Sequence, residues 1–262
     1  MLIEAADLRF GFGGTPVVDG VSLKLARGAL VGILGPNGSG KTTLLRLLSG
    51  ALRPQQGHVT LDGQDLSRMP REVLARRLAV VPQETHLAFD YSVLELVLMG
   101  RYPHLGAFEV EGPADLASAD AALAATDTGH LAERAFHTLS GGEKQRVVIA
   151  SALAQLDEGL PASGGQGRLL LLDEPTASLD LRYQIEVSAL LARLHHRRDI
   201  TIVLSTHDLH FASSLCREVV LLKEGRVLAA GTPADVLTPP RLSSLYQIGV
   251  ELVPPIAFSV VP

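Results

Sequence analysis

Short apolar segments alternate with polar turns along the whole chain, and their pattern predicts strands and helices. Residues 2–12 and 21–25 alternate in part between apolar and polar side chains, which is typical of strands with one buried face. Residues 29–34 form a continuous apolar run, as expected of a strand buried on both faces. Turn residues end this run, and a helix is predicted at 41–48. Two further short strands are expected at 58–61 and 79–81.

The middle of the chain carries a helical pattern instead. Ser92 can cap the N-terminus of an apolar helix, and residues 113–126 are rich in alanine and prone to form a helix. We therefore expect a mostly helical insert over residues 85–155. The stretch 157–168 is polar and rich in glycine, which predicts a loop.

Strands and helices alternate again in the last third of the chain. Short apolar runs predict strands at 168–172, 200–204 and 219–222, with helices between them at 180–195 and 209–215. Alternation of this kind predicts a parallel sheet with helices on its faces.

Composition excludes several classes of protein. Of the 262 residues, 47% are hydrophobic, but no run of eighteen apolar residues occurs, whereas a membrane-spanning helix needs about 20. The net charge of −5 argues against a protein whose main partner is DNA or RNA, because such proteins usually carry a basic excess. No signal peptide is visible, and the single cysteine, Cys216, cannot form an intramolecular disulfide.

The strongest local motif fits the pattern G-x-x-x-x-G-K-[ST] of a phosphate-binding loop, and it lies between a predicted strand and a predicted helix. Glycines in such a loop let backbone N–H groups surround phosphates, and the helix N-terminus favours negative charge. Lys41 is expected to reach the β- and γ-phosphates, and Thr42 to offer its hydroxyl to Mg²⁺. A plain Gly-rich turn is the alternative. The candidate nucleotide-binding residues here are Gly35, Pro36, Asn37, Gly38, Ser39, Gly40, Lys41, Thr42 and Thr43.

A second motif follows four leucines at 169–172, where two carboxylates end a buried strand. Ligands of open α/β sheets bind at the carboxyl ends of the strands. Asp173 can hold Mg²⁺ there, directly or through water, and Glu174 can polarise the attacking water of a nucleoside triphosphatase. The alternative is that both residues merely end a strand.

A third motif precedes an apolar helix expected at 146–156, and Ser140 can cap that helix so that its N–H groups form a second anion site. The motif consists of Leu139, Ser140, Gly141, Gly142 and Glu143. It resembles the LSGGQ signature of ABC-type ATPases, and the resemblance extends over nearly the whole chain.

Four further positions match that family in order. Gln83 is similar to the glutamine of the Q-loop, which senses the γ-phosphate and Mg²⁺. Asp180 corresponds to the D-loop aspartate, and His207 to the switch histidine that positions the water. Phe12 matches the aromatic residue that stacks on adenine, where tyrosine is more usual. Each match is weak alone, but the ordered set is specific.

The resemblance implies an α/β fold. It predicts a P-loop NTPase (RecA-like) core with a mixed or parallel sheet at residues 1–84 and 163–262, with an N-terminal antiparallel β part. An inserted helical signature subdomain is expected at 85–162, and the Gly-rich loop at 157–168 lies at its end.

The resemblance also implies a mechanism that uses ATP and Mg²⁺. Two copies are expected to close head to tail around two ATP molecules, so that residues 139–143 contact the nucleotide of the other copy. Asp180 would couple the two sites. Catalysis is assigned to Glu174, His207 and Gln83, and Mg²⁺ to Thr42, Gln83 and Asp173.

Residues 90–104 are similar to the corresponding segment of ATPases in importers of iron-siderophore, haem and vitamin B12. This implies an ATPase that energises uptake through separate polytopic membrane permease subunits, with a periplasmic or surface substrate-binding protein in the same system and no nucleic acid. We expect it at the cytoplasmic face of the cell membrane as a peripheral protein. Part of the segment, around residues 93–99, would dock on the permease.

Two other classes of function remain open at this point. A soluble ABC ATPase of DNA repair or translation usually carries two ATPase units or a long insert, and neither is visible here. An inactive nucleotide-binding module is disfavoured because Lys41, Asp173, Glu174 and His207 are all present.

Overall fold

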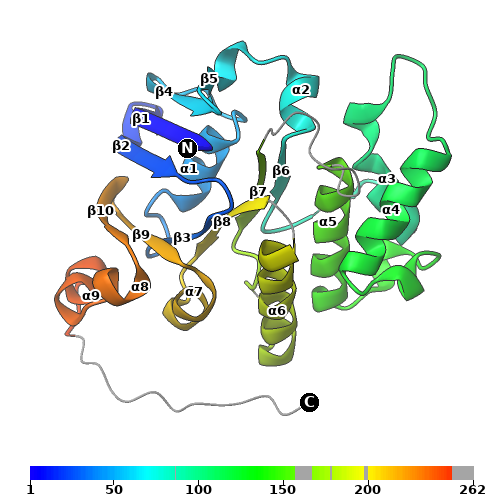
Figure 1. Ribbon diagram of the computed structural model, residues 1–262. Coiled ribbons are helices and arrows are strands. Elements are labelled where there is room, and N and C mark those ends of the chain that lie inside the picture. Colours follow the sequence, from blue (N-terminus) through cyan, green and yellow to red (C-terminus); the bar gives the residue numbers. More distant parts are fainter. Residues whose placement is uncertain (86, 157–166, 178, 198–199, 250–262) are drawn as a thin grey trace.

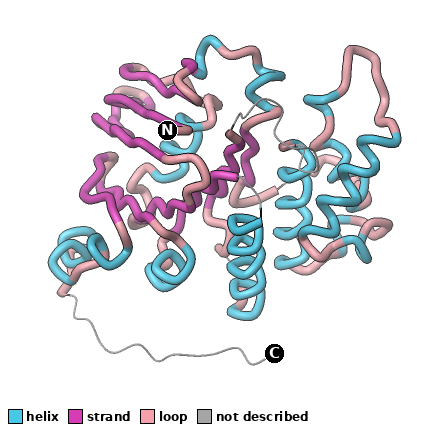
Figure 2. The backbone as a smooth tube through the Cα atoms, viewed as in Figure 1, coloured by secondary structure: helices cyan, strands magenta, loops and turns pink. Residues whose placement is uncertain are grey.

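Two β-sheets and a helical segment make up the part of the chain that the structure describes. The structure is a computed structural model, and it describes residues 1–85, 87–156, 167–177, 179–197 and 200–249. Within these ranges the strands form one four-stranded and one six-stranded sheet, and the helical segment lies to one side of both (Figures 1 and 2).

The four-stranded sheet is antiparallel and has the order β2-β1-β4-β5. Its strands are β1 (Ile3–Phe12), β2 (Thr15–Leu25), β4 (Gln56–Leu61) and β5 (Gln64–Asp65). The second strand starts at Thr15 and not at residue 21 as predicted. Gly13 and Gly14 both have positive φ values of 55° and 84°, and a two-residue turn of this kind joins antiparallel strands directly.

The six-stranded sheet has the order β10-β9-β3-β8-β7-β6, and five of its strands are parallel, as the alternation of strands and helices predicted. The parallel strands are β3 (Leu30–Leu34), β6 (Leu78–Val81), β7 (Arg168–Asp173), β8 (Ile200–Thr206) and β9 (Glu218–Lys223). β10 (Arg226–Gly231) runs antiparallel to β9 and was not predicted.

Two hydrophobic clusters cover the two faces of this sheet. Leu169 and Leu171 of β7 belong to the cluster shared with the four-stranded sheet and α1 (Lys41–Leu48), whereas Leu170 and Leu172 belong to the other. The second cluster includes residues of α6 (Leu181–Arg197) and α7 (Leu209–Leu215). Successive side chains of a strand point to opposite faces, so an unbroken leucine run serves both clusters.

The helical segment contains α3 (Val93–Met99), α4 (Pro113–Ala125) and α5 (Gly141–Gln155). Ser92 caps α3 through a capping box with Glu95, which confirms the predicted cap. α5 begins at Gly141, earlier than the apolar stretch expected at 146–156. Ser140 forms a second capping box that supports a helix start on two glycines, which confirms Ser140 as the cap. Val93, Leu96 and Val97 are buried inside this segment, so their side chains belong to its core, and docking of the segment on a permease stays a prediction.

Side chains that bind backbone carbonyls join the helical segment to the core. The Nε2 group of Gln155 donates to the carbonyl oxygens of Ala75 and Leu78 at 2.8 and 3.0 Å. In the opposite direction, Nε of Arg76 donates to the carbonyl oxygen of Pro103 at 2.7 Å. We call these contacts the seam.

The remaining elements are short. They comprise α2 (Arg71–Ala75), α8 (Pro233–Val236), α9 (Pro239–Tyr246) and 3₁₀ turns at Leu66–Arg68, Tyr102–His104, Gly129–Leu131 and Phe136–Thr138. The predicted boundary at 84/85 falls between β6 and α3, and the boundary at 162/163 lies outside the described residues. Most of the predicted loop at 157–168 also lies outside them, and Arg168 already belongs to β7. In the described part of the chain, every helix is too short or too polar to cross a bilayer.

Candidate active site

The loop between β3 and α1 has the geometry of a phosphate-binding loop. α1 begins at Lys41, and Gly40 at its N-cap has a φ of 101°. A Cβ at this position would lie 2.6 Å from the carbonyl oxygen of Val17, so both the conformation and the space demand glycine. The first N–H groups of α1 lack carbonyl partners within the helix, which makes this end of the helix an anion-binding site.

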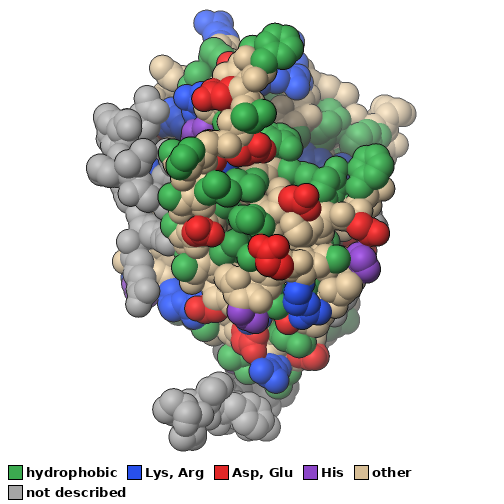
Figure 3. Space-filling model, turned by 90° about the vertical axis from the view of Figure 1, so that its right-hand side faces the viewer, with side chains coloured by type: hydrophobic (Ala, Val, Ile, Leu, Met, Phe, Trp, Pro, Cys, Tyr) green, Lys and Arg blue, Asp and Glu red, His purple; other side chains and the backbone are tan. Residues whose placement is uncertain are grey.

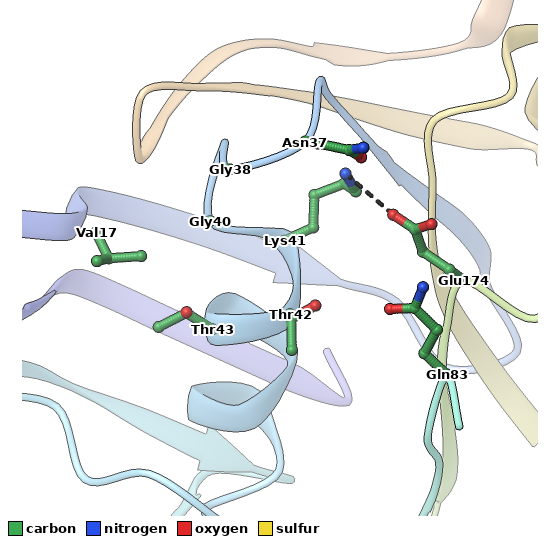
Figure 4. A pocket seen from close by; sticks show the side chains of 9 residues that line it. All are labelled: Val17, Asn37, Gly38, Gly40, Lys41, Thr42, Thr43, Gln83 and Glu174. Carbon is green, nitrogen blue, oxygen red and sulfur yellow. Dashed lines mark ion pairs between the residues drawn. The ribbon is translucent and has the colours of Figure 1, made fainter. Parts of the chain in front are cut away.

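A cavity of about 410 Å³ opens in front of this loop (Figure 4). It is lined by Val17, Asn37, Gly38, Gly40, Lys41, Thr42, Thr43, Gln83 and Glu174. Gln83 follows β6 and Glu174 follows β7, so residues from the carboxyl ends of three parallel strands meet here, as expected for a ligand site of an α/β sheet.

The side chain of Lys41 is held inside the loop. Its Nζ donates to the carbonyl oxygens of Gly35 and Pro36 at 2.9 and 3.2 Å, and it lies 3.2 Å from Oε1 of Glu174. Only 5% of the lysine side chain is exposed. The ammonium group therefore lies at the cavity wall with its charge partly balanced by one carboxylate (Figure 4).

Glu174 lies between the loop lysine and the switch histidine. Its Oε2 is 3.1 Å from Nδ1 of His207, while its Oε1 faces Lys41. Its backbone φ is 46°, a conformation that costs a non-glycine residue free energy and that concentrates at functional sites. The structure thus brings together Lys41, Glu174 and His207, three of the residues that the sequence singled out.

Asp173 is buried directly before Glu174 at the end of β7. Its Oδ1 accepts a hydrogen bond of 2.6 Å from the hydroxyl of Ser205 on the neighbouring strand β8. Sequence reasoning missed Ser205 because it ended this strand at Leu204, whereas β8 continues through Thr206. The available signal was a pair of hydroxyl residues between an apolar run and His207.

The three predicted Mg²⁺ ligands offer oxygen donors, which are the donors that this ion prefers. Thr42 and Gln83 line the cavity, whereas Asp173 does not. Among the described residues, Oδ2 of Asp173 has no hydrogen-bond partner, so one carboxylate oxygen remains available. The donor set therefore fits the ion in chemistry.

Phe12 is placed at the end of β1, and 54% of the residue is exposed. Its ring meets that of Phe10 edge to face, with 5.0 Å between the centroids. It does not line the cavity, whereas Val17 of β2 does. Its contact with adenine stays a prediction.

The signature residues lie at the start of α5, and none of residues 139–143 lines the cavity. The N–H and the hydroxyl of Ser140 both donate to Oε2 of Glu143 at 2.8 Å. These hydrogen bonds hold the pKa of the Glu143 carboxyl below its ordinary value. Asp180 is exposed and accepts a hydrogen bond from the N–H of Tyr183 at 3.2 Å.

Comparisons with known proteins agree with this geometry. A family model described as "ABC transporter" matches residues 18–177. The hemin import ATP-binding protein HmuV of Bordetella pertussis is 42% identical over 252 residues, which cover 96% of this chain and 94% of that protein. The cobalamin import ATP-binding protein BtuD of Halobacterium salinarum is 38% identical over 252 residues, which cover 96% of this chain and 60% of that protein.

A solved structure has the same fold. It is an inward-facing conformation of a transporter described as of the metal-chelate type, and it superposes with a TM-score of 0.80 at 32% identity. The match covers 95% of this chain and 89% of that one. The matched family model spans more than half of the chain, and together with these identities it shows that the chain belongs to the ABC transporter family, as an ATP-binding subunit that hydrolyses ATP.

Proposed function

We propose that this chain is the ATP-hydrolysing subunit of an importer of haem. The observation that carries the proposal is the 42% identity to the hemin import protein of B. pertussis, which runs over 96% of this chain and 94% of the relative. The alternative of a soluble ATPase in DNA repair or translation gains no support, because the relatives described above are import proteins or a transporter.

The contacts of the site support the following roles for its residues. The phosphates of ATP lie against the loop of residues 35–43, and Lys41 contacts the β- and γ-phosphates. Glu174 acts as the base for the attacking water, with His207 next to it at 3.1 Å and Gln83 on the same cavity wall. Phe12 stacks on adenine. The short distance between Glu174 and His207 supports a joint role at the γ-phosphate.

Mg²⁺ would be held by Thr42, Gln83 and Asp173. The ion supplies charge neutralisation for the phosphate oxygens during phosphoryl transfer. The protein residues orient the donors, and Ser205 keeps one oxygen of Asp173 engaged so that the other is free.

The position of the signature motif supports a head-to-tail dimer. Residues 139–143 lie outside the cavity of their own chain, and Ser140 caps a helix whose first N–H groups can bind an anion. In the proposed dimer, these groups contact the ATP of the second copy. Asp180 is exposed, follows Leu179, whose side chain lies next to Gly141, and couples the two sites.

The proposed partners are polytopic permease subunits and a periplasmic or surface substrate-binding protein, and the chain would lie peripherally at the cytoplasmic face of the membrane. The face of the helical segment carries hydrophobic side chains among charged ones (Figure 3). Exposed aromatic residues flank α3: Phe89 is 72% exposed and Tyr102 is 56% exposed. These residues, and not the buried ones of α3, offer a surface to the permease.

Uptake in a strain that lacks the gene tests the substrate. Wild-type chain is expected to restore growth on haem as the only iron source, and the Glu174→Gln variant is expected to fail. Parallel cultures receive cobalamin or a ferric siderophore as the limiting nutrient. Growth restored on either of these, and not on haem, would overturn the haem assignment.

A second candidate substrate is cobalamin, which the 38% identity to the protein of H. salinarum supports. It ranks lower because the identity is lower and the match covers only 60% of that protein. The cobalamin culture in the same experiment decides between the two.

A further inference from the structure

The hydroxyl of Ser205 connects the two carboxylate residues of the active site. It donates to Oδ1 of Asp173 at 2.6 Å and accepts the backbone N–H of Glu174 at 2.9 Å. Ser205 is 0% exposed, and Asp173 is 8% exposed. A single buried side chain thus contacts the proposed metal ligand and the proposed base at the same time.

The strand register explains this position. β7 and β8 are parallel, and Asp173 is the direct partner of Ser205 in their ladder. On its other side, Ser205 pairs with Ile33 of β3, the strand that leads into the phosphate-binding loop. The backbone of the serine is therefore fixed from both sides by strand pairing, and two hydrogen bonds hold its hydroxyl.

We propose that Ser205 is a positioning residue for the ATPase reaction. Its one donor engages Oδ1 of Asp173, so Oδ2 is left to face Mg²⁺. Its acceptor holds the N–H of Glu174, whose backbone has the unfavourable φ of 46°. This inference rests on the proposed roles of Asp173 and Glu174, and it adds a residue that binds neither metal nor nucleotide.

Removal of the hydroxyl has a defined consequence. Ser205→Ala removes the buried partner of Oδ1 of Asp173 and of the N–H of Glu174. The carboxylate then rotates more freely, and metal affinity falls. Loss of such supporting hydrogen bonds typically lowers metal affinity or activity by about 10- to 100-fold.

The same strand supplies a matched control. Thr201 is 1% exposed and lies at the opposite end of β8, where its hydroxyl accepts a hydrogen bond from the N–H of Gly28 at 2.9 Å. Thr201→Val also removes one buried hydroxyl from this strand, but far along it from the site. Both variants are expected to have a lower free energy of unfolding. Urea denaturation measures this loss, which is the structural part of each effect.

The test measures Mn²⁺ binding by electron paramagnetic resonance, with a non-hydrolysable ATP analogue and full-length protein. Ser205→Ala should raise the Mn²⁺ dissociation constant by about tenfold or more, with the same shift in the Mg²⁺ concentration that half-saturates turnover. Nucleotide affinity without metal should not change. Thr201→Val should leave the Mn²⁺ dissociation constant, the Mg²⁺ dependence of turnover and the nucleotide affinity unaltered. Ser205→Cys, whose thiol is a weak donor, should give an intermediate constant and replaces the alanine variant if that variant does not fold.

Two results would overturn the proposal. One is a folded Ser205→Ala protein with wild-type Mn²⁺ affinity and Mg²⁺ dependence. The other is an equal loss of metal affinity in Thr201→Val, which would make the effect a general result of lost stability. An Asp173→Asn variant distinguishes a failure of this proposal from a failure of the proposed function. Unchanged Mn²⁺ binding in Asp173→Asn would refute Asp173 as a metal ligand, and with it the metal role of Ser205.

Discussion

The ring of Tyr183 occupies the space into which any side chain at position 142 would point. A Cβ on Gly142 would lie 2.1 Å from Cδ1 of Tyr183, so only glycine fits there. Tyr183 belongs to the first turn of α6, and its N–H donates to Asp180. The signature motif and the D-loop, which are far apart in the sequence, therefore meet through one aromatic ring.

Gly142→Ala is expected to destabilise the protein by about 1–3 kcal/mol, because the added methyl group overpacks a filled contact. It should also shift the start of α5 and reduce turnover, while ATP binding to the phosphate-binding loop changes little. Urea denaturation measures the stability, and equilibrium binding of a fluorescent ATP analogue measures the affinity.

The double variant Gly142→Ala, Tyr183→Ala serves as the control for this contact. Removal of the ring makes room for the methyl group, so the two free-energy changes should be non-additive by at least about 0.5 kcal/mol. Strict additivity would show that the two residues do not meet in solution.

Lys41→Ala should lower ATP affinity by about 10- to 100-fold, because a charge-assisted hydrogen bond to phosphate contributes about 1.5–3 kcal/mol. The same variant removes the cation next to Glu174, which lies 3.2 Å away. Isothermal titration calorimetry measures the affinity. Lys24→Ala is the matched control, since Lys24 is exposed and its ammonium group lies 3.6 Å from the carboxylate of Glu4 within the four-stranded sheet. Wild-type affinity in Lys41→Ala would refute the phosphate contact.

Glu174→Gln should retain ATP binding and lose about 10²- to 10⁴-fold in turnover, the usual contribution of a general base. The amide has the same shape as the carboxylate but cannot accept a proton. Because ATP then persists, we expect the variant to accumulate as a dimer in size-exclusion chromatography with ATP. Turnover close to the wild-type rate would show that another group acts as the base.

Burial of the Cys216 thiol affects both the pH dependence of stability and the reactivity of the thiol. Burial raises the pKa of its thiol from 9.0 to about 12, so the neutral thiol stabilises the folded state relative to the unfolded one. This contribution is present below pH 9 and is lost as the pH rises through the folded pKa. Reaction with a disulfide reagent at pH 8 should therefore be slow in the native protein and fast in urea. Fast reaction without denaturant would show that the thiol is exposed.

Much of the fold could be predicted because its signals are local. The leucine run at 169–172 and the start of α1 at Lys41 were correct, since apolar runs and glycine clusters act within a few residues. The start of α5 was predicted in part. Ser140 is the cap, as expected, but the helix already begins at Gly141, because the capping box outweighs the low helix propensity of two glycines. β10 and α9 carry weak patterns and depend on packing against β9.

The candidate site was predicted in part. Lys41, Gln83 and Glu174 do line one cavity, as their motifs suggested. The sequence did not predict the contacts of Ser205 and Tyr183, because each depends on strand register or helix packing between segments about 30 or 40 residues apart. The hydrophobic periodicity of a segment does not indicate which distant segment it will contact.

The hydrogen bonds of the seam are accepted by backbone carbonyl oxygens, which every amino acid possesses. Gln155 and Arg76 bind the carbonyl oxygens of residues 75, 78 and 103, and not their side chains. Substitutions at the accepting positions therefore keep the seam intact as long as the backbone path is retained. A helical segment from a distant homologue should consequently fit onto this core if it brings a donor at the position equivalent to 155 and the core keeps its own donor at position 76. The accepting positions are then free to diverge in sequence while the geometry of the seam is retained.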